Sequence, residues 1–194
     1  MWGQAGVLPA GVMEVTGRPG SGVTSTLLSF LAAPSQSSPV AYVDVRDAVS
    51  PVAAMELGCD LERVAFVNAP EPEQWGRAVG YLLDGVPAVA AEVPRRVPAA
   101  TLRAICARAR ARARLLVLAP LDDRIPSGLT TGRLALEATS WSGVTGGRGH
   151  LTERRVRAAL SGKLARGTTV EGWLCLPSLE WETAKVAPAL AVAQ

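Results

Sequence analysis

The sequence has 194 residues, the usual size of one domain, and its formal net charge of +3 is too small to indicate nucleic-acid binding by itself. Its three cysteines are scattered without C-x-x-C spacing, which argues against a zinc site or a disulfide framework and fits a reducing compartment. There is no basic leader and no apolar run of membrane-spanning length, so we expect a cytoplasmic protein. From the cysteine spacing we expect no metal site.

Short β-type runs alternate with helical stretches through the first 120 residues. The predicted strands are residues 12–16, 40–45, 64–68, 86–91 and 115–119. The predicted helices are residues 24–33, 51–57, 73–83 and 99–113. This alternation is typical of βαβ units, so the sequence predicts an α/β fold with a largely parallel sheet flanked by helices.

The pattern changes after residue 126. Residues 143–149 contain four glycines and predict a flexible turn. Residues 154–160 and 169–176 then predict two strands of an antiparallel hairpin, joined around residues 161–167. The Ala- and Pro-rich stretch that follows reads as a tail. We therefore expect one core over residues 1–176 and a C-terminal tail over residues 177–194.

The motif with the clearest chemistry is G-R-P-G-S-G-V-T at residues 17–24. It fits the phosphate-binding pattern G-x-x-x-x-G-K-[ST] except that Val23 replaces the lysine. A strand precedes it and a helix follows it, the context in which glycines expose backbone N–H groups to an anion. The sequence therefore predicts a degenerate nucleotide site. Its residues are Gly17, Gly20, Gly22, Val23, Thr24 and, from the fourth strand, Glu92.

Arginines and one tryptophan supply candidate binding surfaces. A basic stripe that could bind DNA phosphates comprises Arg95, Arg96, Arg103 and Arg110. The alternative for these arginines is a solvated helix face. Trp181 is a candidate partner anchor, because tryptophan is favoured at binding hot spots. Its alternative is packing of the tail on its own domain.

Several segments, taken in order, resemble the ATPase core of the RecA recombinase family. The segment V-M-E-V-T-G at residues 12–17 resembles the family's strand into its phosphate loop. A-Y-V-D at 41–44, followed by S-P-V-A-A-M-E-L-G-C-D at 50–60, is similar to the family's F-I-D-A-E-H-A-L-D-P-x-x-A-x-x-L-G-x-D. T-T-G-R-L-A-L at 130–136 resembles T-T-G-G-x-A-L-K-F. The resemblance covers roughly residues 12–176 and implies a RecA-like phosphate-loop core.

The positions that the family uses for catalysis diverge. Val23 replaces the phosphate lysine, Arg46 stands where the family has the carboxylate that activates water, and Pro120 replaces a glutamine that senses the γ-phosphate. Glu92 occupies roughly the position of the magnesium carboxylate. The resemblance therefore implies a pseudo-ATPase with no required cofactor, in which ATP and magnesium binding are doubtful. The enzyme alternative is a weak residual ATPase that uses Glu92 and Arg18.

Two further departures concern self-assembly. Only about eleven residues precede the first strand, and the connections at 93–101 and 122–129, where the family carries its DNA-binding loops, are short. The resemblance therefore implies that the chain forms no RecA-type self-filament. Single-stranded DNA remains a candidate ligand through the arginines named above.

Within the family, the chain most resembles the ImuA′ group of actinobacterial mutagenesis accessory factors. That resemblance implies an SOS-regulated, DNA-damage-induced adaptor in DNA repair by translesion synthesis, cytoplasmic or associated with the nucleoid. The implied partner is an ImuB-type inactive Y-family polymerase homologue, and through it an error-prone C-family polymerase. The alternative from the same lineage is a SulA-like cell-division inhibitor.

Overall fold

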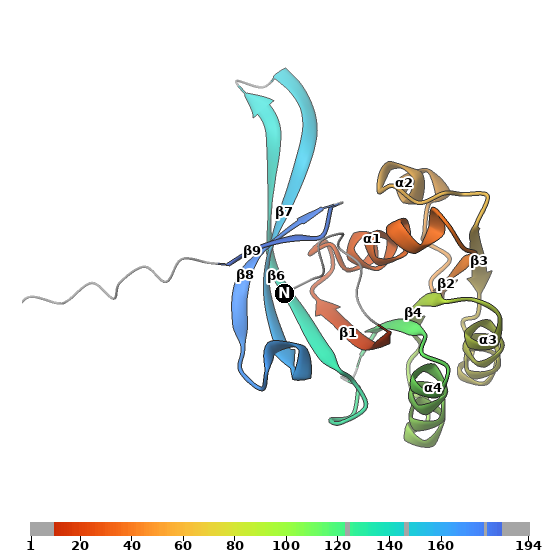
Figure 1. The fold of residues 1–194 in the computed structure, drawn as a ribbon. Helices are drawn as coiled ribbons and strands as arrows, with labels where there is room; N and C mark the ends of the chain where they lie inside the picture. The colour runs from red at the N-terminus through yellow and green to blue at the C-terminus, as the bar shows by residue number, and fades with distance from the viewer. Residues whose placement is uncertain (1–9, 123–124, 146–147, 177, 184–194) are drawn as a thin grey trace, which may run out of the picture.

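The computed structural model describes residues 10–122, 125–145, 148–176 and 178–183. The described strands form one nine-stranded sheet in the order β3-β2-β4-β5-β1-β6-β7-β8-β9. The first six of these run parallel, and β6 to β9 pair antiparallel. The predicted α/β class, with a mixed sheet flanked by helices and an antiparallel C-terminal part, is confirmed (Figure 1).

The parallel part follows the predicted alternation closely. Its strands are β1 (Gly11–Gly17), β2 (Val40–Asp44), β3 (Val64–Asn68), β4 (Ala88–Val93) and β5 (Leu115–Pro120). Its helices are α1 (Val23–Ser35), α2 (Pro51–Glu56), α3 (Pro72–Gly85) and α4 (Ala99–Ala111). These boundaries confirm all nine predicted elements to within a few residues, because each apolar run is bounded by glycine, proline or a polar turn.

The antiparallel part is larger than the sequence suggested. It contains β6 (Gly132–Thr145), β7 (Arg148–Gly162), a short 3₁₀ helix (Lys163–Ala165), β8 (Val170–Leu176) and β9 (Glu180–Thr183). The predicted hairpin corresponds to β7 and β8, but β6 was missed. β6 and β7 rise together beyond the rest of the molecule (Figure 1), and the two central residues of the predicted glycine turn, 146–147, lie outside the described residues.

The tail prediction is wrong for residues 180–183, which add β9 to the edge of the sheet. Trp181 lies opposite Leu174 of β8 and packs, partly buried, against the main apolar cluster. Gly172 makes this possible, because a Cβ at that position would lie 2.7 Å from the indole ring of Trp181. The structure therefore packs Trp181 on its own domain.

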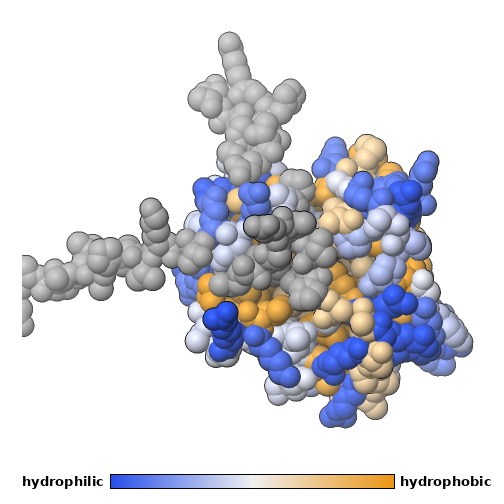
Figure 2. Space-filling view, in the orientation of Figure 1, coloured by the Kyte–Doolittle hydropathy of each residue, from blue (hydrophilic) through white to orange (hydrophobic). Residues whose placement is uncertain are grey.

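Two apolar clusters fill the space between the sheet and its helices. One joins the sheet to α1 and α2 and includes Leu27, Leu31 and Ala54, and the other joins it to α3 and α4 and includes Trp75 and Ile105. The central parallel strands β2, β4 and β5 are therefore buried on both faces. Hydrophilic residues gather over α3 and α4 at the lower right of the space-filling view (Figure 2). Within the described residues, none of the helices has the length and apolar character needed to cross a bilayer.

One backbone feature near the end of α4 yields a stability prediction. Ala113 follows the helix with a left-handed φ of 51°, while Arg114 donates its N–H to the Ala109 carbonyl at 2.8 Å. Glycine is the usual residue at such a helix end, since a Cβ is strained there. We expect Ala113→Gly to raise the free energy of unfolding by about 0.5 kcal/mol in urea denaturation.

The matched control for that prediction is Ala107→Gly, at an exposed position within the same helix. It should lower the free energy of unfolding by about 1 kcal/mol, because glycine is a poor helix former. If both substitutions destabilise the protein equally, the strain assigned to Ala113 is wrong.

Candidate functional site

The glycine loop lies between β1 and α1 and borders a cavity of about 290 Å³. Gly20 and Gly22 have φ values of 81° and 100°, in the region that favours glycine. α1 begins directly after Gly22, with no acidic residue in its first turn and no side chain capping its N-terminus. Its free N–H groups and helix dipole therefore contribute positive potential beside the cavity.

The single carboxylate among the cavity-lining residues belongs to Glu92, near the carboxyl end of β4. One strand, β5, separates β4 from β1, so Glu92 lies across the cavity from the loop. The Glu92 side chain is 3% exposed and forms an ion pair with Arg46, whose Nε lies 3.0 Å from Oε1. Its second oxygen accepts the Val45 N–H at 3.1 Å. Both carboxylate oxygens thus have protein partners.

Asp44 holds Arg46 in this position. Its buried carboxylate, at the end of β2, accepts backbone N–H groups from Arg46 at 3.1 Å, and from Ala48 and Val49 at 2.8 Å each. These bonds fix the turn between β2 and α2, in which Asp47 takes a left-handed φ of 53°. The turn directs Arg46 toward Glu92 and also places its Nη2 3.5 Å from the Thr24 hydroxyl.

The directions of the pKa shifts of Arg46 and Tyr42 agree with this pairing. The hydrogen bond to Glu92 is the largest effect on the Arg46 guanidinium and raises its pKa above the ordinary value. Burial raises the pKa of the nearby Tyr42 hydroxyl, and the negative charges of Glu92 and Asp44 raise it further. The one carboxylate that lines the cavity is therefore paired with the Arg46 guanidinium.

A second arginine reaches the loop from the antiparallel part of the sheet. Arg154 of β7 donates from Nη2 to the Gly20 carbonyl at 2.7 Å and from Nη1 to the Ser25 hydroxyl at 3.2 Å. Its guanidinium also stacks 4.9 Å from the centre of the Trp141 ring. A Cβ at Gly22 would lie 3.0 Å from the Arg154 guanidinium, so glycine favours this close approach.

The structure gathers the residues of the predicted nucleotide site around one cavity. Its lining contains all six predicted positions, Gly17, Gly20, Gly22, Val23, Thr24 and Glu92, together with Arg18, Arg46 and Pro120. The sequence prediction missed Arg154. No local motif marks that arginine, because its place depends on the pairing of β7 with β6 and of β6 with β1.

The four arginines predicted to bind DNA lie in the loop before α4 and on α4 itself. Arg95 pairs with Asp122 at 3.0 Å, whereas Arg110 turns to the carbonyl groups of Gly128 and Leu129. Arg103 lies exposed on α4, and Arg96 lies in the loop before it with a left-handed φ of 61°.

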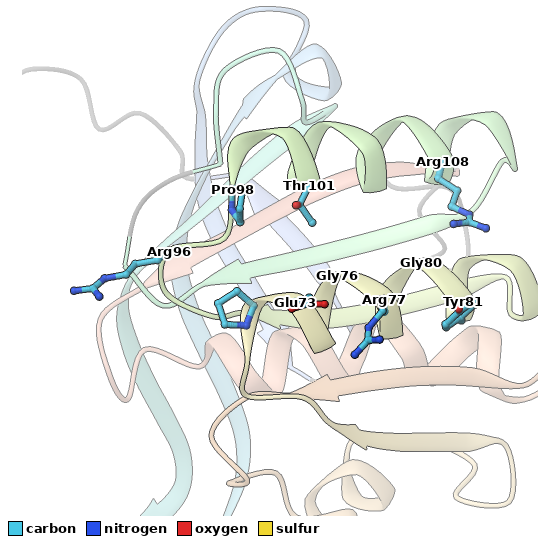
Figure 3. Close-up of a pocket in the computed structure, with 10 residues that line it drawn as sticks. Glu73, Gly76, Arg77, Gly80, Tyr81, Arg96, Pro98, Thr101 and Arg108 are labelled. Atoms are coloured by element: carbon cyan, nitrogen blue, oxygen red, sulfur yellow. The ribbon is translucent and has the colours of Figure 1, made fainter.

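A larger cavity, of about 560 Å³, lies between α3 and α4. Its lining includes Gly76 and Gly80 of α3 and Thr101 and Arg108 of α4. A Cβ at Gly76 would lie 2.9 Å from the Thr101 methyl, so the glycines serve the close packing of the two helices. Arg108 pairs with Asp84, and Arg96 points away from both helices (Figure 3).

One protein-family model matches the N-terminal part of the chain. Residues 3–126 match the family MT3502 N-terminal domain, and this match includes the glycine loop, Arg46 and Glu92 but not Arg154. None of the curated proteins matches the sequence. The match spans more than half of the chain, which therefore belongs to the MT3502 N-terminal domain family.

Proposed function

We propose that the chain is a catalytically degenerate, RecA-like accessory protein of damage-induced translesion mutagenesis. In this role it acts as an adaptor that binds an ImuB-type inactive Y-family polymerase homologue and, through it, an error-prone C-family polymerase. The observation that carries the proposal is the Arg46–Glu92 ion pair beside a phosphate loop that lacks its lysine. The named partners rest on the sequence resemblance.

The Arg46–Glu92 ion pair supports the proposed absence of ATP hydrolysis for two reasons. Glu92 is 3% exposed and its carboxylate charge is already compensated by Arg46, so it is a poor ligand for a magnesium ion. Arg46 cannot accept a proton from water, because a guanidinium stays protonated in proteins. With Val23 in place of lysine, neither a general base nor the usual transition-state cation is available.

The adaptor proposal is tested with the purified full chain. We expect it to co-elute in gel filtration with the ImuB-type homologue from the same genome, with or without ATP and magnesium. Phosphate release from ATP should stay at the buffer rate in the wild type and in Glu92→Gln. The SulA-like alternative implies binding to the cell-division protein FtsZ. Co-elution with FtsZ in place of the polymerase homologue would indicate such an inhibitor. Magnesium-dependent phosphate release that Glu92→Gln removes would contradict the loss of turnover.

A further inference from the structure

The cavity beside the glycine loop carries positive charge that the described residues do not neutralise. Three arginines and one carboxylate line it: Arg18, Arg46, Arg154 and Glu92. The positive charge of Arg46 and the negative charge of Glu92 balance each other. The guanidinium groups of Arg18 and Arg154 and the N-terminus of α1 remain. A helix N-terminus adds roughly half a positive charge.

Arg154 is the most informative of these groups. It forms no ion pair with a carboxylate in the described part of the chain, and its acceptors are a carbonyl and two hydroxyl oxygens, those of Gly20, Ser25 and Thr139. Its Nε is buried without a hydrogen-bond partner. Burial lowers the pKa of this guanidinium. A partly buried cation of this kind is stabilised when an anion binds beside it.

We propose that this cavity binds the phosphate group of a small molecule without a divalent metal ion, through the guanidinium groups of Arg154 and Arg18 and the N-terminus of α1. Arginine is well suited to this task, because its planar donors match phosphate oxygens. This proposal rests on the proposed function, in which Glu92 pairs with Arg46 and therefore does not bind magnesium. The phosphate can come from a nucleotide or from an inorganic anion.

The test is isothermal calorimetry of the full chain with inorganic pyrophosphate, with ADP and with adenosine, all in EDTA. We expect pyrophosphate and ADP to bind, adenosine not to bind, and affinity to fall as salt rises. Similar affinities for the first two ligands identify an inorganic anion site, and a clear preference for ADP identifies a nucleotide site. Magnesium should not strengthen the binding of either.

Three variants locate the site. Arg154→Gln should weaken pyrophosphate binding about tenfold or more, the loss expected for a charge-assisted hydrogen bond. Arg18→Gln changes an exposed side chain that lines the same cavity, and it should weaken binding in the same direction. The matched control is Arg157→Gln, three residues along β7 on the opposite face, which should bind like the wild type. Thermal melting of each variant verifies folding.

Glu92→Gln separates this proposal from an ordinary magnesium-nucleotide site. The substitution removes a negative charge from the cavity and releases Arg46, so it should strengthen pyrophosphate binding in EDTA. A magnesium site would instead lose affinity. The proposal is overturned if folded wild-type protein binds neither pyrophosphate nor ADP in EDTA, or if Arg154→Gln and Arg18→Gln bind like the wild type. That outcome leaves the adaptor function intact, whereas magnesium-dependent hydrolysis contradicts the proposed function itself.

Discussion

Replacing Arg133 with alanine should lower the free energy of unfolding by about 3–5 kcal/mol. Its ion-pair partner Glu14, on β1 just before the glycine loop, is 0% exposed. Glu14 also accepts the Ile125 N–H at 2.8 Å, and Arg133 donates to the Ile125 carbonyl. Without the guanidinium, Glu14 is left as a buried charge with one remaining hydrogen bond. Urea denaturation measures the loss.

Two further variants test the cause of this loss of stability. The double variant Glu14→Gln/Arg133→Met removes both charges and should recover most of the stability, because no buried charge is left unpaired. Arg157→Ala removes an arginine whose pairs with Glu137 and Glu171 are exposed, and it should cost less than about 1 kcal/mol. If Arg133→Ala costs no more than Arg157→Ala, water reaches Glu14 and the burial argument is wrong.

The parallel half of the fold was predictable because its signals are local. Its strands contain short apolar runs that end at a turn residue, as in Leu115 to Ala119 before Pro120. Proline at the start of α2 and α3 marks where those helices begin. The glycine loop then follows from the strand–glycine–helix context alone, and the structure brings Glu92 to the same cavity from a distant segment.

The antiparallel half depends on tertiary pairing, which the sequence pattern does not contain. In β6, the apolar alternation at Leu134 and Leu136 is interrupted by a register shift before Ala138, so the periodicity stops while the strand continues. Residues 180–183 have polar and aromatic character typical of a tail. They join the sheet because Gly172 leaves space for the Trp181 ring.

The chemistry of the site was only partly predictable for the same reason. The resemblance predicted that Arg46 replaces a carboxylate, but its pairing with Glu92 depends on the turn that Asp44 organises. Arg154 is 132 residues from Gly22, yet it covers the glycine loop through two successive strand pairings. Such a contact becomes visible only after the sheet order is known.

A second large change, in both stability and magnesium binding, is expected from the substitution Arg46→Ala. Because Glu92 is 3% exposed while Arg46 is about half exposed, removal of the guanidinium should lower the free energy of unfolding by about 2 kcal/mol, less than for a fully buried pair. It also frees one Glu92 oxygen in the cavity. Magnesium is commonly held by one or two carboxylates together with substrate phosphates.

The Arg46→Ala protein should therefore gain a magnesium response that the wild type lacks. We expect its melting temperature with ADP to rise when magnesium replaces EDTA, since a ligand that binds only the folded state stabilises it. The wild type should melt at the same temperature in both conditions. The control Arg46→Ala/Glu92→Gln should lose the response, because it has no free carboxylate at this position. If Arg46→Ala shows no magnesium response, Arg46 does not block a metal position at Glu92.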